Sequence, residues 1–179
     1  MKNILVKDVM IPISSYVTLK ESHTLLDVFQ ILEEYRTSSS HAHRDAIVVD
    51  ENGSVKGKIT MIEIFTALEP NYNKLFKSYR DGTLTKESVR SSAKNIKLWQ
   101  EPIQTVCERG RGIMVSEVMH TPDNNEFIQE DDSLEKALHK YVMGAHQPLI
   151  VQNREQVTGF LRFGDLFEVI RKRMLTCEL

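Results

Sequence analysis

The sequence predicts an α/β fold in which one β-α-β-β-α unit occurs twice, with pseudo-two-fold symmetry and a helical segment between the copies. Residues 57–65 recur as residues 159–167: a glycine opens a short apolar strand, a polar residue ends it, and an acid follows three positions later. An amphipathic helix pattern recurs in the same order, at a shift of 109 positions (134 − 25). Recurrence of both patterns in one order indicates a duplicated structural unit.

Each copy begins with a short lead-in. Residues 6–12 read Val-Lys-Asp-Val-Met-Ile-Pro, and residues 115–122 read Val-Ser-Glu-Val-Met-His-Thr-Pro, again shifted by 109 (119 − 10). A short extended piece follows each lead-in, at 16–19 in the first copy and at 127–128 in the second. The two lead-ins therefore belong to the repeated unit.

An amphipathic helix follows in each copy, since apolar residues at i, i+3, i+4 and i+7 share one helix face. Side chains that commonly cap a helix stand just before it: Ser22 or Thr24 in the first copy, and one of 131–133 (Asp-Asp-Ser) in the second. The two stripes are Leu25, Val28, Phe29 and Leu32, and Leu134, Ala137, Leu138 and Tyr141.

A strand pair and a closing helix complete each copy. Asn52-Gly53 between two β-branched runs predicts a hairpin. From Gly57 and Gly159 onward the two copies are offset by 102 positions (159 − 57) rather than 109. The first copy therefore holds seven extra residues (109 − 102), which we place in the polar loop 36–45. The predicted strands are 46–49 and 55–59, then 149–151 and 157–161; the closing helices carry Ile64, Phe65 and Leu68, then Leu166, Phe167 and Ile170.

The segment between the copies has helical patterning. One apolar stripe lies within 72–79 and another within 85–100, and the second stripe ends before Pro102. The run Glu-Arg-Gly-Arg-Gly at 108–112 is interpreted as a solvated hinge rather than as a mobile arm for a polyphosphate. The predicted organisation is a first repeat at 1–69, a connecting segment at 70–112 and a second repeat at 113–179.

Composition and charge argue against several classes of function. Hydrophobic residues make up 41% and charged residues 27%, which is typical of a globular protein. A formal net charge of −2 argues against general binding to nucleic acid or to an anionic membrane. The polar N-terminus is unlike a signal peptide, and Cys107 and Cys177 lack metal-ligand spacing. We expect a cytoplasmic protein with two reduced thiols rather than a disulfide.

Motifs of catalysis are absent from the sequence. It has no P-loop, no Gly-x-Ser-x-Gly elbow and no His-Glu-x-x-His pair, so we expect no enzyme activity. His41 and His43 are close enough in sequence to share a metal, with His23 or Asp45 as further ligands. Exposed loop histidines explain this pattern better, and we predict no metal site.

In their order and duplication these motifs resemble the tandem cystathionine-beta-synthase (CBS) domain pair, also called a Bateman module. The Val-Met-x-Pro lead-in, the capped helix and the Gly-apolar-x-(Thr/Ser)-x-x-Asp segment carry the resemblance, over residues 1–69 and 113–179. It implies repeats that pack sheet to sheet, a homodimer formed through helices, and an adenine nucleotide in clefts between the repeats. It also implies a regulatory role toward a partner protein, which the sequence does not identify.

The resemblance assigns ligand-binding residues as well. Thr60 takes the phosphate position of the first repeat, and Glu63 stands where an aspartate usually binds ribose. In the second repeat Asp165 matches the ribose position, while Arg162 replaces the hydroxyl residue and either strengthens a phosphate contact or blocks the cleft. We favour the second cleft, because a bidentate guanidinium suits phosphate. Residues implied near the adenine are Pro12, His120, Thr121, Pro122, His146 and Pro148.

Three functions follow as hypotheses. The first is a sensor of AMP, ADP or ATP that signals to a partner by conformational change, which requires the ligand to bind one conformation better than another. The alternative is a ligand-free dimerisation module, which the altered residues Glu63 and Arg162 favour. The third and least favoured is an enzyme that acts on nucleotides on the same scaffold.

Overall fold

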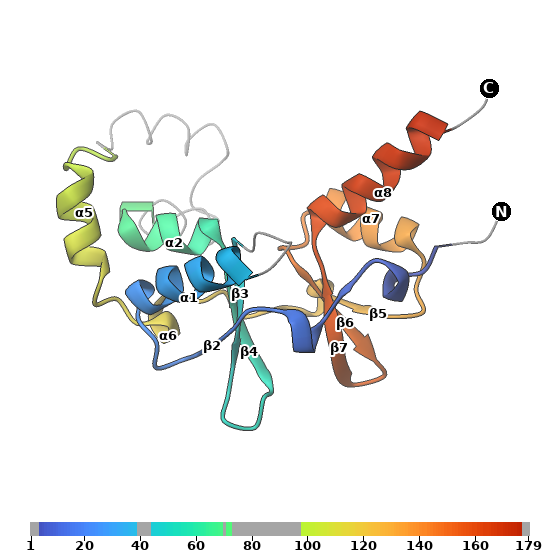
Figure 1. Ribbon diagram of the computed structural model, residues 1–179, viewed down its shortest axis with the longest axis horizontal. Helices are drawn as coiled ribbons and strands as arrows, with labels where there is room; N and C mark the ends of the chain where they lie inside the picture. Colours follow the sequence, from blue (N-terminus) through green and yellow to red (C-terminus); the bar gives the residue numbers. More distant parts are fainter. Residues whose placement is uncertain (1–3, 39–43, 70, 73–97, 177–179) are drawn as a thin grey trace, which may run out of the picture. The chain divides into compact units, whose positions relative to one another are not determined.

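The protein forms two compact units in the computed structural model (Figure 1). The first-repeat unit is Val17–His120, and the second-repeat unit combines Thr121–Leu179 with the N-terminal residues up to Tyr16. Each unit has its own sheet and its own apolar core, which confirms the predicted α/β fold with two repeated units. The structure describes residues 4–38, 44–69, 71–72 and 98–176.

The first-repeat unit is built on a three-stranded sheet in the order β2-β3-β4. β2 runs parallel to β3, and β3 pairs antiparallel with β4. Residues such as Val48 and Ile59 are fully buried against the helices, so the sheet supplies much of the core. The elements are β2 (Thr18–Lys20), α1 (Leu25–Ser38), β3 (Ala46–Val49), β4 (Val55–Ile59), α2 (Met61–Leu68), α5 (Ile103–Gly110) and α6 (Val115–Val118).

Helix α1 begins at one of the two predicted caps, Thr24. The Thr24 hydroxyl accepts a hydrogen bond from the backbone N–H of Asp27 at 3.3 Å, and the Asp27 carboxylate accepts one from the backbone N–H of Thr24 at 2.7 Å. The bonds that the Asp27 carboxylate accepts from the Thr24 backbone N–H and, at 2.8 Å, from the Thr24 hydroxyl hold the pKa of Asp27 below its usual range. Leu25 and Val28 are buried as expected, whereas Phe29 is 50% exposed.

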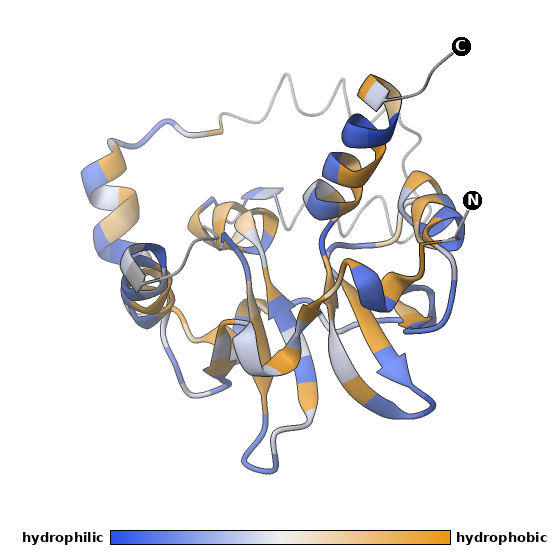
Figure 2. Cartoon of the chain, turned by 45° about the vertical axis from the view of Figure 1, so that its right-hand side comes forward, coloured by the Kyte–Doolittle hydropathy of each residue, from blue (hydrophilic) through white to orange (hydrophobic). Residues whose placement is uncertain are grey.

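The turn between β3 and β4 is the predicted hairpin. Asp50 accepts hydrogen bonds from the backbone N–H groups of Asn52 and Ser54, each at 2.9 Å. Gly53 has a φ of 79°, which glycine adopts without steric cost. In Figure 2 the hairpin tips are hydrophilic and the strands behind them largely hydrophobic, as expected where only the strands enter a core.

The connecting segment contains α5, a helix that the sequence interpretation missed. The prediction of a hinge at 108–112 is wrong for its first three residues, which form the last part of α5. Gly110 allows α5 to approach α2 closely, since an added Cβ would lie 2.3 Å from Leu68 Cδ2. The buried residues of α5 are Val106 and Gly110, so its packed face has a single apolar side chain and gave little periodic pattern from which to predict the helix.

Two residues of the connecting segment, Asn71 and Trp99, are bonded to the carboxylate of Glu69. The backbone N–H of Trp99 donates to Glu69 Oε2 at 2.8 Å, and that of Asn71 donates to Oε1 at 3.2 Å. Trp99, predicted to end a helix, lies instead in a turn with φ of 54°. The predicted helices otherwise fall at 73–97, outside the described residues.

The second-repeat unit is built on a four-stranded sheet in the order β1-β7-β6-β5. β5 runs parallel to β6, and β7 pairs antiparallel with both β6 and β1. The elements are η1 (Val6–Asp8), β1 (Ile11–Pro12), η2 (Ile13–Ser15), η3 (Asn124–Glu126), β5 (Phe127–Gln129), α7 (Leu134–Val142), β6 (Leu149–Asn153), β7 (Gln156–Leu161) and α8 (Phe163–Thr176).

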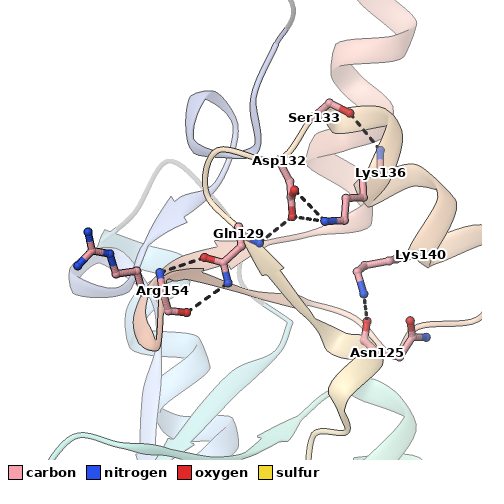
Figure 3. Close-up of polar contacts among 7 residues, drawn as sticks. All are labelled: Asn125, Gln129, Asp132, Ser133, Lys136, Lys140 and Arg154. Atoms are coloured by element: carbon pink, nitrogen blue, oxygen red, sulfur yellow. Dashed lines mark hydrogen bonds and ion pairs between the residues drawn. The ribbon is translucent and has the colours of Figure 1, made fainter.

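Polar contacts fix the start of α7 and the β6–β7 turn (Figure 3). The Ser133 side chain caps α7 by accepting from the Lys136 backbone N–H, as the sequence predicted for this cluster. The Gln129 side chain accepts from the Arg154 N–H at 3.0 Å and donates to its carbonyl at 3.2 Å. Arg154 has a φ of 59°, and this two-way contact stabilises the backbone there.

Each lead-in pairs with a strand of the other copy: residues 115–122 with β4, and residues 6–12 with β7. In the first-repeat unit, Lys58 and His120 exchange two backbone hydrogen bonds of 2.9 Å each. In the second-repeat unit, Ile11 stands opposite Phe160 in the β1–β7 pair. The compact units thus group the chain differently from the sequence repeats, whose boundaries at 69/70 and 112/113 stay a prediction.

The two histidines proposed as metal ligands, His41 and His43, lie outside the described residues. His23, a further candidate, accepts a hydrogen bond at Nδ1 from the backbone N–H of Lys20 at 3.2 Å. Among the described residues, no helix combines the length and the apolar character needed to cross a membrane.

Candidate functional site

The predicted phosphate and ribose residues of the first repeat, Thr60 and Glu63, are bonded to each other at the start of α2. Thr60 donates through Oγ1 to Glu63 Oε2 at 2.5 Å, and its backbone N–H donates to the same oxygen at 2.9 Å. The Thr60 hydroxyl also accepts from the backbone N–H of Ile62 at 3.2 Å. This is a capping box, so both side chains already serve the helix start.

The corresponding residues of the second repeat, Arg162 and Asp165, are also paired. Arg162 Nε donates to Asp165 Oδ2 at 2.7 Å, and Nη2 donates to Oδ1 at 2.9 Å. The two side chains are 17% and 27% exposed, so the pair is reachable from solvent without being fully hydrated. Two parallel N–H···O bonds between charged groups form the stronger class of ion pair.

The two pairs differ in what they leave for a ligand. A threonine hydroxyl accepts a helix N–H, but a guanidinium has only donors and cannot cap a helix. The first turn of α8 therefore receives no side-chain cap from Arg162, and its amide groups carry a positive partial charge. Nothing lies within 4 Å of the Cβ that a substitution at Gly164 would add in this turn. The start of α8 is thus open and suited to an anion.

The remaining candidates are placed on both units. His120 closes the first-repeat unit, where its backbone is bonded to Lys58, a fully buried residue of β4. The other five belong to the second-repeat unit together with Arg162 and Asp165. They are Pro12 in β1, Thr121 and Pro122 before η3, and His146 and Pro148 before β6. Pro148 is buried, Pro12 and Thr121 are exposed, and Pro122 and His146 lie between these extremes.

Gly57 and Gly159 contribute to this region in a way that the sequence interpretation did not assign. A Cβ at Gly57 would lie 2.6 Å from Met119 Sδ, and one at Gly159 would lie 2.5 Å from the backbone oxygen of Ile11. Each glycine therefore lets a lead-in lie against the strand that ends at a candidate residue. The only sequence signal was the recurrence of glycine at the same place in both copies.

Comparison with known proteins supports the resemblance to CBS domains. Residues 6–70 match the CBS domain family. No curated protein sequence matches the chain significantly.

Solved structures extend this likeness over the whole chain. The CBS-pair protein CBSX2 from Arabidopsis thaliana is similar with a TM-score of 0.62 at 15% identity, covering 98% of this chain and 100% of that chain. CBSX2 solved in complex with AMP gives a TM-score of 0.58 at 15% identity, covering 95% and 98%. An uncharacterised conserved protein from Pyrococcus horikoshii gives 0.60 at 16% identity, covering 100% and 99%.

Residues 6–70 therefore match the CBS domain family, and the whole chain has the fold of CBS-pair proteins. This confirms the resemblance inferred from the duplicated motifs.

Proposed function

We propose that this protein is a regulatory module that binds an adenine nucleotide (AMP, ADP or ATP) at the start of α8 and signals to a partner protein. The observation that carries the proposal is the Arg162–Asp165 pair at an open helix N-terminus. It combines a bidentate cation for phosphate with a carboxylate that accepts hydrogen bonds from ribose hydroxyls.

Binding requires the pair to change partners. A phosphate group competes with Asp165 for the guanidinium of Arg162, and the α8 amide groups add to the attraction. Released from Arg162, the Asp165 carboxylate is able to accept from two hydroxyl groups. The ion pair therefore holds the ligand-free conformation, and a nucleotide that separates it shifts the population toward another conformation.

The relatives support this assignment by analogy of fold. CBSX2 has been crystallised in complex with AMP. At 15% identity the likeness to CBSX2 extends to the fold alone. The proposed ligand is therefore inferred from the residues of this chain.

A thermal-shift series with AMP, ADP, ATP and GTP tests the proposal. A ligand that binds only the folded state stabilises it by about 2.7 kcal/mol at a hundred times its Kd. We expect a shift with adenine nucleotides that is lost in Asp165→Asn and retained in Glu168→Gln. Glu168 is a suitable control because it makes a similar pair with Arg171 on the same helix. Equal shifts in both variants would reject the α8 site.

The second candidate function is a dimerisation module without a ligand. The specific observation in its favour is that both Thr60–Glu63 and Arg162–Asp165 are already internally bonded. It predicts no thermal shift with any adenine nucleotide at millimolar concentration.

A homodimer is part of either proposal. Helix α8 carries an exposed apolar stripe at i, i+4, i+7 and i+11, formed by Phe163, Phe167, Ile170 and Met174. In Figure 2 the ribbon of α8 alternates between hydrophobic and hydrophilic colours, as an amphipathic helix does. Phe167→Glu is expected to yield monomers in analytical ultracentrifugation, whereas Lys172→Glu, on the opposite face, is expected to leave the dimer intact.

A further inference from the structure

The first-repeat unit holds an apolar pocket of about 450 Å³ that contains none of the residues assigned to the nucleotide. Its walls come from the first turns of α1, from the end of α2 and from α5. Its size lies within the range of small-molecule pockets, roughly 300–1,000 Å³. The lining residues are Leu25, Leu26, Phe29, Leu68, Gln104, Cys107, Glu108, Gly110 and Arg111.

The concave shape depends on α5. Gly110 has no side chain, and Leu68 fills the space that a Cβ would take, which brings the end of α5 against α2. Phe29 faces the pocket and remains 50% exposed. An apolar ring and leucines in an open hollow are suited to an apolar chain or ring.

Charged groups occur only on the α5 side of the lining. The Glu108 carboxylate accepts a hydrogen bond from the Gln104 side chain at 2.8 Å. Arg109, which is not a lining residue, is bonded to Glu101 and to the carbonyl of Leu68. In the described part of the chain, by contrast, no carboxylate pairs with the guanidinium of Arg111. Among the residues that the structure describes, the pocket thus offers one cation without a carboxylate partner, Arg111, at the edge of an apolar surface.

From this combination we infer that the pocket binds a small amphipathic carboxylate, with its apolar part against Leu26 and Phe29 and its carboxylate on Arg111. A guanidinium binds carboxylate through two parallel hydrogen bonds. Glu108, on the same side of the pocket, opposes an anion by charge repulsion. Its removal therefore strengthens binding, while removal of Arg111 weakens it.

Decanoate is the probe for the test, with decylamine as its charge-reversed counterpart, both below their micellar concentrations. Binding is measured by calorimetry and by protection of the Cys107 thiol, which lines the pocket and is exposed. Alkylation by N-ethylmaleimide is followed in the Cys177→Ser background, so that Cys107 alone reacts. We expect saturating decanoate to slow alkylation at least fivefold, and decylamine to leave the rate unchanged.

Three variants test the charge assignment, and a fourth tests whether the ligand occupies the hollow. Arg111→Gln is expected to weaken decanoate binding about tenfold, and Glu108→Gln to strengthen it severalfold. Arg154→Gln, an exposed arginine of the other unit, serves as the matched control and is expected to change nothing. Leu26→Trp, which fills the hollow, is expected to abolish binding while the melting temperature stays near that of the wild type.

Several results would overturn the inference. They are unchanged alkylation with decanoate, equal binding of decylamine, or a loss of binding in Arg154→Gln as large as in Arg111→Gln. A Cys107 reaction that slows as protein concentration rises, without decanoate, would assign the pocket to a second copy of the chain instead. Nucleotide-induced thermal shifts are measured separately, so failure here leaves the α8 proposal standing.

Discussion

Arg162 and Asp165 face each other across the first turn of α8, joined by hydrogen bonds of 2.7 Å and 2.9 Å. The equivalent positions in the first repeat, 102 residues earlier (162 − 60), hold Thr60 and Glu63, joined by a bond of 2.5 Å. The same two positions therefore interact in both repeats, but with a helix cap in one and an ion pair in the other. Only the ion pair leaves the helix start without a side-chain acceptor at the cap position.

The Arg162–Asp165 pair is expected to contribute modestly to folding. Because both side chains are partly exposed, solvent screens the attraction, and a double-mutant cycle of Arg162→Gln with Asp165→Asn should give a coupling energy of about 1 kcal/mol. Chemical denaturation of the four proteins measures it. A coupling near zero would show that the pair does not hold the ligand-free conformation.

Substitution of the strand glycines is expected to destabilise the protein unequally. In Gly159→Ala the new Cβ meets the backbone oxygen of Ile11, which cannot move aside without shifting the lead-in, so a loss of about 2 kcal/mol is expected. In Gly57→Ala the nearest atom belongs to the flexible Met119 side chain, so the loss should be smaller.

Gly164→Ala is the control for these two variants. It adds a Cβ in open space within a helix, where alanine is favoured over glycine by roughly 0.5–1 kcal/mol. Urea denaturation should therefore rank stability as Gly164→Ala at or above wild type, then Gly57→Ala, then Gly159→Ala. The reverse order of the last two would contradict the contacts described for the lead-ins.

Glu69 is expected to make stability depend on pH. Hydrogen bonding from the Trp99 backbone N–H, opposed by desolvation and aided by Asn71, holds the pKa of Glu69 below its usual range. A carboxyl whose pKa is lower in the folded state stabilises fully above its unfolded pKa of about 4.3, and this contribution disappears as pH falls through the folded value. The stability difference between wild type and Glu69→Gln should therefore be constant at pH 6–7 and shrink below about pH 4.

Loss of the Glu69 carboxylate should also loosen the connecting segment at Asn71 and Trp99. Glu69→Ala leaves the N–H groups of Asn71 and Trp99 without their acceptor, at a cost of about 2 kcal/mol. Hydrogen exchange at Trp99 should accelerate in Glu69→Ala while exchange in the second-repeat unit is unchanged. Exchange that rises equally in both units would indicate a general loss of stability instead.

Tyr141 is expected to anchor α7 to the sheet of the second-repeat unit. Its hydroxyl donates to the carbonyl of Leu161 and accepts from the backbone N–H of Leu149 at 3.0 Å. Tyr141→Phe leaves both backbone groups unpaired in a buried setting, so a loss of about 2 kcal/mol is expected in denaturant titrations. A neutral effect would mean that water replaces the hydroxyl.

Local pattern was enough to predict the repeats, the hairpin at Asn52-Gly53, and a cap at each first helix, which the structure assigns to Thr24 and Ser133 among the candidates. Each of these depends on residues close in sequence, and turn and cap chemistry act over a few positions. The pairing of Arg162 with Asp165 was not predicted, although a separation of three places both residues on one side of a helix start. Helix α5 escaped prediction because its packing partner Leu68 lies far from it in sequence.

The sequence by itself determined that two copies of one α/β unit are present and which polar residues begin their closing helices. Tertiary structure decided which lead-in packs with which sheet, because the backbone pairs of His120 with Lys58 and of Ile11 with Phe160 join residues distant in the chain. It also decided that Glu69 binds the backbone of both Asn71 and Trp99 and that α5 shapes a pocket. Long-range contacts of this kind depend on the close packing of segments that are distant in sequence. A local sequence pattern does not encode that packing.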